Sequence, residues 1–165
     1  AQRWKGVKSL ERPELPKRLV FDAGPFILLF TNERGSDVAR EAVTLHERGE
    51  MEVFIHPNNL AEAYRVISRI REEKAELLTR DVEPEMVIRS AYATLNVIQD
   101  EKTTVNLGML KLRYGDKPWG DLSSAALALR LSNETRMPVV ILDEEEHFED
   151  LKEVEAIKIS NLKLK

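Results

Sequence analysis

The stretch that decides the fold is RLVFDAGPFILLF, at residues 18–30. Its first part, Arg18 to Asp22, predicts a short buried strand that ends in an acidic residue. Ala23-Gly24-Pro25 then predicts a turn, and the apolar segment Phe26 to Phe30 follows it. Because a carboxylate beside buried apolar residues is costly unless it is paired or binds a cation, Asp22 is the first candidate functional residue.

Four further strands are predicted along the chain. The run Met137 to Leu142 (MPVVIL) has no polar alternation, which is typical of an interior parallel strand, and Asp143 follows it directly. Met51 to His56 (MEVFIH), Asn96 to Gln99 (NVIQ) and Val154 to Ile159 (VEAIKI) predict the others.

Helical segments separate these strands. The predicted helices begin at Ser36 or Asp37, after Pro57-Asn58-Asn59, at Pro84, at Thr104 as a cap, and at Asp121. Gly49 is expected to end the first of them. In the second, the residues expected on one face are Leu60, Ala63, Tyr64, Ile67 and Ile70. Strands that alternate with helices predict a three-layer α/β fold with a mostly parallel sheet.

The length of 165 residues fits one globular domain, predicted over residues 18–165. The polar residues 1–17, which include two prolines, predict an N-terminal extension. The net charge of −4 argues against a basic DNA-binding module, and the absence of cysteine excludes thiolate zinc sites and disulfide scaffolds. No apolar run approaches the length of a membrane span and the N-terminus has no apolar signal core, so a cytoplasmic protein without membrane contact is expected.

Four acidic residues are expected to meet at one edge of the predicted sheet. Asp22 and Asp143 end strands, Glu62 lies about one turn into the helix after the second strand, and Asp121 opens the helix before MPVVIL. Sites in open parallel sheets form outside the carboxyl ends of the strands. Converging carboxylates repel one another, and bound Mg²⁺ or Mn²⁺ relieves that repulsion. Such a cluster can hydrolyse a phosphodiester bond with one or two ions.

Each acid also has an ordinary structural interpretation. Asp121 would serve as a helix cap, Asp143 as a loop residue after a strand, and Glu62 as a solvated helix residue. The ordered set of four is more specific than any single member.

These segments together resemble the PIN domain, the nuclease fold of toxins in VapBC-type toxin–antitoxin pairs. The resemblance covers about residues 18–159, and the matching segments are RLVFDAGPFILLF, HPNNLAEAYRVI, LRYGDKPWGDLSSAALALRLS and MPVVILDEEEHFEDL. It implies an α/β/α sandwich with a central parallel sheet of about five strands. It also implies an Mg²⁺- or Mn²⁺-dependent endoribonuclease, often a homodimer, whose catalytic and metal-binding acids are Asp22, Glu62, Asp121 and Asp143.

The chain departs from the family pattern around the fourth acid. Ile141 stands where the family usually has Thr or Ser, and Phe148 lies five residues after Asp143 rather than about three. Glu144 or Glu145 is therefore an alternative fourth acid.

Four residues are candidates for RNA binding. Arg65 and Arg69 share a helix face after Glu62 and would hold phosphates, or else form a solvated face paired with nearby glutamates. Lys117 and Trp119 precede Asp121, and the indole would stack a base or pack on the neighbouring helix. His147 is expected to be a loop residue.

The leading hypothesis is a metal-dependent endoribonuclease with an RNA substrate, and a small antitoxin as partner if the chain is a toxin. One alternative is a catalytically weak or inactive PIN-like protein for RNA binding or assembly. The other is an Asp-based, Mg²⁺-dependent phosphatase with Asp22 as nucleophile, although the second aspartate that such enzymes carry two residues later is Gly24 here. The chain has no phosphate-binding GxxxxGK[ST] loop, no GxGxxG fingerprint and no GxSxG elbow.

Overall fold

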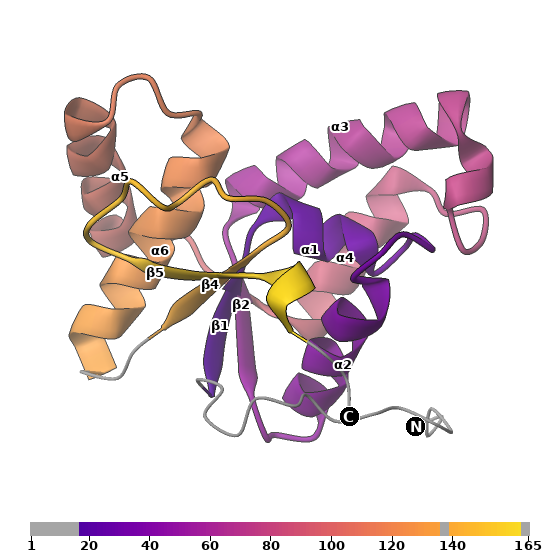
Figure 1. The fold of residues 1–165 in the computed structure, drawn as a ribbon, viewed down its shortest axis with the longest axis horizontal. Coiled ribbons are helices and arrows are strands. Elements are labelled where there is room, and N and C mark those ends of the chain that lie inside the picture. Colours follow the sequence, from indigo (N-terminus) through magenta and orange to yellow (C-terminus); the bar gives the residue numbers. More distant parts are fainter. Residues whose placement is uncertain (1–16, 136–138, 163–165) are drawn as a thin grey trace.

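The computed structural model describes residues 17–135 and 139–162, so the predicted extension lies outside the described part except for Lys17. A five-stranded sheet in the order β3-β2-β1-β4-β5 forms the centre of the fold, and every pairing in it is parallel. Figure 1 labels β1, β2, β4 and β5. The strands are β1 (Arg18–Phe21), β2 (Glu52–Ile55), β3 (Asn96–Val97), β4 (Val140–Asp143) and β5 (Glu155–Lys158).

Strand β1 occupies the middle of the sheet, and its register sets the position of everything at the carboxyl edge. Phe21 lies opposite Ile55 of β2 on one side and Leu142 of β4 on the other. The residues that follow these strands therefore emerge next to each other, as the sequence predicted for Asp22 and Asp143.

The two faces of the sheet are covered by different helices. The helices are α1 (Ala23–Leu28), α2 (Ser36–Glu47), α3 (Pro57–Glu73), α4 (Pro84–Thr94), α5 (Glu101–Arg113) and α6 (Trp119–Thr135). Leu19 and Phe21 pack into a core with α1 to α4, whereas Val20 points to the opposite face and packs with α5 and α6. This alternation confirms the predicted three-layer α/β/α sandwich.

Three local predictions are wrong. Ala23-Gly24-Pro25 forms the start of α1 instead of a turn, because a proline in the first turn of a helix lacks only an N–H that has no intrahelical partner. Helix α5 begins at Glu101, capped by Asp100, whose carboxylate accepts a hydrogen bond from the Thr103 N–H at 2.8 Å, so Thr104 is not the cap. Helix α6 begins at Trp119 rather than at the predicted Asp121, which lies in its first turn.

Helix α2 begins at Ser36, but its N-cap is Gly35 at φ 96°, and no side chain caps it. Gly49 follows the end of this helix at φ 74°, as predicted. None of the helices in the described ranges has the length and apolar character needed to cross a membrane.

Three glycine-to-alanine variants test this account of the backbone. At Gly35 a Cβ would lie 3.2 Å from Ile159 and 3.3 Å from Leu28 in a left-handed conformation, so Gly35→Ala should cost about 2 kcal/mol of unfolding free energy. Gly49→Ala, left-handed but in open space, should cost about 1 kcal/mol. Gly108→Ala, helical and uncrowded, should stabilise by about 1 kcal/mol. Urea unfolding measures the change in unfolding free energy for each variant. Equal changes at the three sites would contradict the roles assigned to the glycine backbone conformations.

Candidate active site

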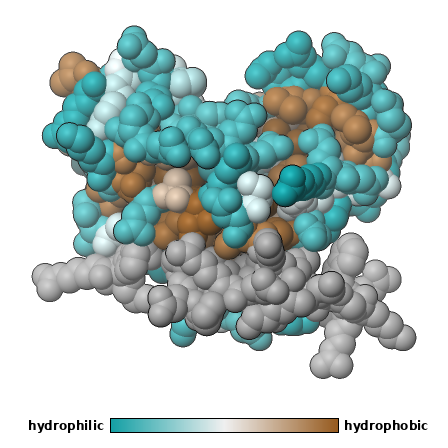
Figure 2. Space-filling model, in the orientation of Figure 1, coloured by the Kyte–Doolittle hydropathy of each residue, from teal (hydrophilic) through white to brown (hydrophobic). Residues whose placement is uncertain are grey.

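The four acids predicted from the sequence line one cavity of about 360 Å³ at the carboxyl edge of the sheet. Asp22 and Asp143 come from the ends of β1 and β4, Glu62 from α3 and Asp121 from the first turn of α6. On this side the molecule is hollowed between the part that contains α3 and the part that contains α5 and α6, and the hollow is bordered mainly by hydrophilic residues (Figure 2). The loop after β4 adds Glu144, Glu145 and His147 to the cavity wall.

Asp22 is only 4% exposed, and two buried side chains hold it in place. The Ser124 hydroxyl donates to Asp22 Oδ1 at 2.7 Å, and the Asn59 amide donates to the same oxygen at 3.0 Å. Asn59 Nδ2 also donates to the backbone oxygen of Gly120 at 3.0 Å, which ties α3 to the start of α6. Asn59 and Ser124 were not predicted from the sequence. The only signal for them is a polar residue at a buried helix position beside Leu60 or Ala125.

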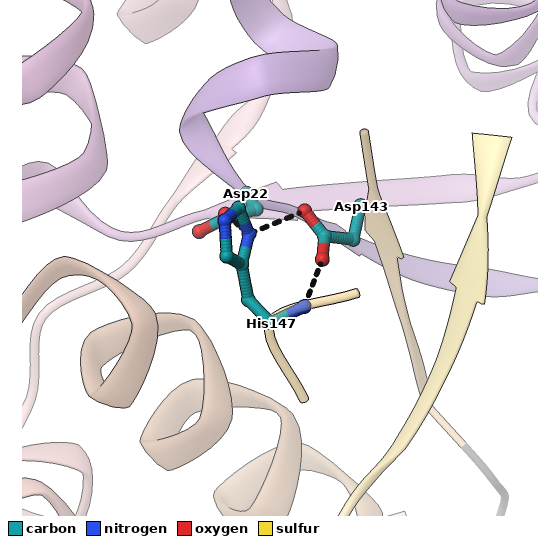
Figure 3. Close-up of side chains that lie close together, drawn as sticks. All are labelled: Asp22, Asp143 and His147. Atoms are coloured by element: carbon teal, nitrogen blue, oxygen red, sulfur yellow. Dashed lines mark hydrogen bonds and ion pairs between the residues drawn. The ribbon is translucent and has the colours of Figure 1, made fainter. Parts of the chain in front are cut away.

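Asp143 is 1% exposed, and His147 binds it twice (Figure 3). The His147 backbone N–H donates to Asp143 Oδ2 at 3.0 Å, and the ring Nδ1 lies 3.1 Å from Oδ1. Nδ1 also lies 3.9 Å from Asp22 Oδ2, and Nε2 lies 3.3 Å from Glu145 Oε2. His147 is a loop residue, as expected, but its ring points into the group of acids, a position not predicted from the sequence.

Two glycines allow the outer acids to approach the cavity. A Cβ at Gly120 would lie 2.8 Å from Glu62 Oε2, so the carboxylate of Glu62 rests against the bare backbone that precedes Asp121. A Cβ at Gly24 would lie 2.8 Å from Glu144 Oε2 in the same way. Both alternative fourth acids, Glu144 and Glu145, therefore lie at the cavity, while Asp143 occupies its buried end.

The electrostatics of this cavity favour a cation. The pKa of Asp22 is raised to about 7: burial is the largest cause, the charges of Asp143, Asp121 and Glu62 add to it, and the hydrogen bond from Ser124 opposes it. Burial likewise raises the pKa of Asp121 and of Glu144. Burial lowers the pKa of His147, but Asp143 and the other acids outweigh that effect and the net direction is upward. A positive ion in the cavity would relieve these repulsions.

The residues predicted to bind RNA are not among those that line the cavity. Arg65 and Arg69 are exposed on α3, three and seven residues after Glu62, which places all three on one helix face. Trp119 is 55% exposed, and Lys111 Nζ lies 5.0 Å from the centre of its ring. Lys117 has protein partners, since its Nζ donates to the His147 backbone oxygen at 2.9 Å and pairs with Asp150 at 2.7 Å. RNA binding by these four residues stays a prediction.

The fold of this chain is similar to folds found among solved structures. Searches of the sequence against protein-family models and against characterised proteins found no match. Among solved structures, a similar chain occurs in the crystal structure of VapBC2 from Rickettsia felis. In that structure VapBC2 is bound to a DNA fragment from its promoter. The match has a TM-score of 0.59 at 14% identity and covers 85% of this chain and 97% of that one. The chain has a PIN-like fold. A toxin–antitoxin complex from Klebsiella pneumoniae matches this PIN-like fold at a TM-score of 0.50 and 15% identity, covering 86% of this chain and 97% of that one.

The raised pKa of Asp22 predicts that Asp22→Asn stabilises the protein in metal-free buffer. A carboxyl group whose pKa rises from 3.8 to about 7 on folding leaves stability undiminished below pH 4 and lowers it as the pH rises towards 7. The amide keeps the oxygen that accepts from Ser124 and Asn59 but carries no charge. We expect the variant to melt about 5 °C higher than the wild type at pH 8, with the gain vanishing near pH 4.

Thermal unfolding with EDTA at both pH values measures this effect. Asp81→Asn is the control, because Asp81 is an exposed aspartate paired with Arg71 and should change the melting temperature little at either pH. Equal melting temperatures of Asp22→Asn and wild type at pH 8 would show that Asp22 is not under electrostatic strain.

Proposed function

We propose that this chain is a PIN-type endoribonuclease that depends on Mg²⁺ or Mn²⁺. The observation that supports the proposal best is the convergence of Asp22, Glu62, Asp121 and Asp143, from four separate elements, on one cavity. The donors are hard carboxylate oxygens, of which Asp22 and Asp143 are buried and the former has a strongly raised pKa. This donor set fits a small divalent ion, because Mg²⁺ and Mn²⁺ prefer carboxylate and water ligands.

In this proposal Asp22 and Asp143 hold the ion, with Glu62 and Asp121 completing the site. A bound ion would polarise a water molecule and the phosphate to be cleaved. Asn59 and Ser124 fix the carboxylate of Asp22 through its Oδ1. Hydrolysis breaks the bond between phosphorus and the 3′ oxygen, which leaves a 3′-hydroxyl and a 5′-phosphate.

Exposed residues around the cavity would bind the RNA strand. Arg65 and Arg69 continue the helix face of Glu62 and would pair with phosphates on one side of the scissile bond. Trp119 opens α6 next to the cavity-lining Pro118, with enough exposed ring to stack a base. Lys117 would act indirectly in this proposal, because it holds the loop that carries His147.

We further propose that the chain is the toxin of a toxin–antitoxin pair and forms a homodimer. The fold similarity to the two toxin–antitoxin complexes supports the toxin assignment, and the homodimer is what the PIN resemblance implies. A small antitoxin would block the cavity by presenting an arginine to the acids, because a guanidinium pairs with carboxylates through two parallel hydrogen bonds.

Cleavage of a panel of fluorescent single-stranded RNAs tests the nuclease proposal. We expect wild type to cleave with Mg²⁺ or Mn²⁺ and not with EDTA. Asp22→Asn should lose at least 100-fold in rate while remaining folded, and the control Asp81→Asn should cleave like the wild type. Cleavage by Asp22→Asn at the wild-type rate would contradict the site assignment.

Two other outcomes would favour the alternatives. RNA binding without cleavage, and without divalent-metal binding tighter than millimolar by calorimetry, would favour a catalytically inactive PIN-like binding protein. A trapped phosphoaspartate at Asp22 would favour the phosphatase.

The phosphate contacts predict a change in salt dependence. In an Asp22→Asn background, which retains RNA uncleaved, Arg65→Ala with Arg69→Ala should weaken RNA binding. Each phosphate contact on a single strand contributes about 0.7 to the slope of log affinity against log salt concentration. Loss of two contacts should therefore reduce the magnitude of this slope by about 1.4. Fluorescence anisotropy at several salt concentrations measures it. Arg89→Ala is the control, because Arg89 lies on α4 in an exposed pair with Glu85; an equal change in this variant would contradict specific contacts by α3.

A further inference from the structure

His147 meets the geometric requirements of a metal ligand. Its Nδ1 and one oxygen each of Asp22 and Asp143 all lie within 4.8 Å of one another. Nδ1 lies 3.1 Å from the Asp143 oxygen and 3.9 Å from the Asp22 oxygen. Neighbouring ligands around an octahedral ion with bonds of ~2.1 Å lie about 3 Å apart and opposite ones about 4 Å apart, so one ion fits between these three atoms with small adjustments.

The other ring nitrogen of His147 lies within ion-pair distance of a carboxylate. Nε2 of His147 lies 3.3 Å from Glu145 Oε2. A histidine that binds a metal through one nitrogen usually donates the N–H of the other to a carboxylate or carbonyl, which fixes the tautomer and the ring orientation. With the proton on Nε2, facing Glu145, Nδ1 would be free to bind an ion in place of the proton that it now shares with Asp143.

The backbone around His147 is also held in place. Its N–H donates to Asp143 Oδ2 at 3.0 Å, and its carbonyl accepts from Lys117 Nζ at 2.9 Å. Lys117 is itself paired with Asp150 at 2.7 Å. Contacts on both sides of the residue fix where the ring lies, which is a property expected of a ligand and not needed for a solvated loop histidine.

We propose that His147 is a nitrogen ligand of the ion held by Asp22 and Asp143, and that it makes this site prefer Mn²⁺ to Mg²⁺. Imidazole nitrogen binds transition-metal ions well, whereas Mg²⁺ prefers an all-oxygen shell. The inference rests on the metal site of the proposed function and adds to it a ligand and a metal preference. Glu145 is a positioning residue in this arrangement, which gives one of the two alternative fourth acids a separate role.

The direct test is the electron paramagnetic resonance of Mn²⁺ bound to the full chain. Electron spin-echo modulation detects a histidine ¹⁴N bonded to manganese, whatever the activity of the protein. We expect ¹⁴N modulation in the wild type and its loss in His147→Gln, which replaces the nitrogen by an amide oxygen. Glu145→Gln should retain the modulation and weaken Mn²⁺ binding less.

Calorimetric titration with Mn²⁺ and Mg²⁺ tests the preference. His147→Gln should weaken Mn²⁺ binding at least tenfold and change Mg²⁺ binding less than threefold, so the preference for Mn²⁺ falls. Glu146→Gln is the matched control, because it removes a charge from the same loop at a residue whose described partner is Lys158, outside the acidic group. Circular dichroism confirms that each variant is folded.

The outcomes separate this inference from the proposed function. Mn²⁺ bound without ¹⁴N modulation, or with equal affinity in His147→Gln and wild type, would overturn the role of His147 and leave the four-acid site standing. Failure of wild type and Asp22→Asn alike to bind either ion would overturn both proposals. Loss of modulation in His147→Gln together with a smaller Mn²⁺ preference would establish His147 as a ligand.

Discussion

Strands β1 and β4 pair side by side in the sheet. This pairing places the carboxylates of Asp22 and Asp143 next to each other at the carboxyl ends of the two strands, where both are buried. The backbone N–H of Asp22 donates to the carbonyl of Leu142 at 3.1 Å, so the ladder continues to the residue that bears the charge. Two like charges in that position repel each other, and much of the surrounding structure offsets the repulsion. Ser124 and Asn59 donate to Asp22, and His147 binds Asp143 through both its backbone and its ring.

Helices from opposite faces of the sheet meet above this edge. Helix α3 packs with the first core and α6 with the second, yet their N-terminal ends are joined. Asn58 Nδ2 donates to Ser123 Oγ at 2.9 Å, and Asn59 Nδ2 donates to the Gly120 carbonyl at 3.0 Å. The small residues of α6 that follow Leu122 are fully or almost fully buried, so the helix lies close to β1 and the hydroxyl of Ser124 reaches Asp22. The same pair of helix ends presents Glu62 and Asp121 to the cavity.

The strands and the acids could be predicted from the sequence because their signals are local. MPVVIL predicted an interior strand, and the acid after it needed only the rule that parallel strands end at a common edge. Asn59, Ser124 and His147 could not be assigned to the site in the same way, because their roles depend on tertiary contacts. Ser124 is 102 residues from Asp22 in the sequence. Nothing in the residues around this serine indicates which side chain its hydroxyl contacts. The start of α1 was mispredicted since Ala23-Gly24-Pro25 fits both a turn and a first helical turn, and packing decides between them.

The strand order has a consequence for how the molecule is made. Strand β1 is formed from an early part of the chain, but its neighbour β4 comes from a late part, after α6. A nascent chain on the ribosome can pair β1 with β2 long before it can close the other side of the central strand. Until β4 and the loop that follows it have left the ribosome, Asp22 lacks its neighbours Asp143 and His147. The cavity is thus among the last features to form during synthesis. An unfinished chain contains Asp22 and Glu62 but lacks Asp143 and His147, so its site is incomplete.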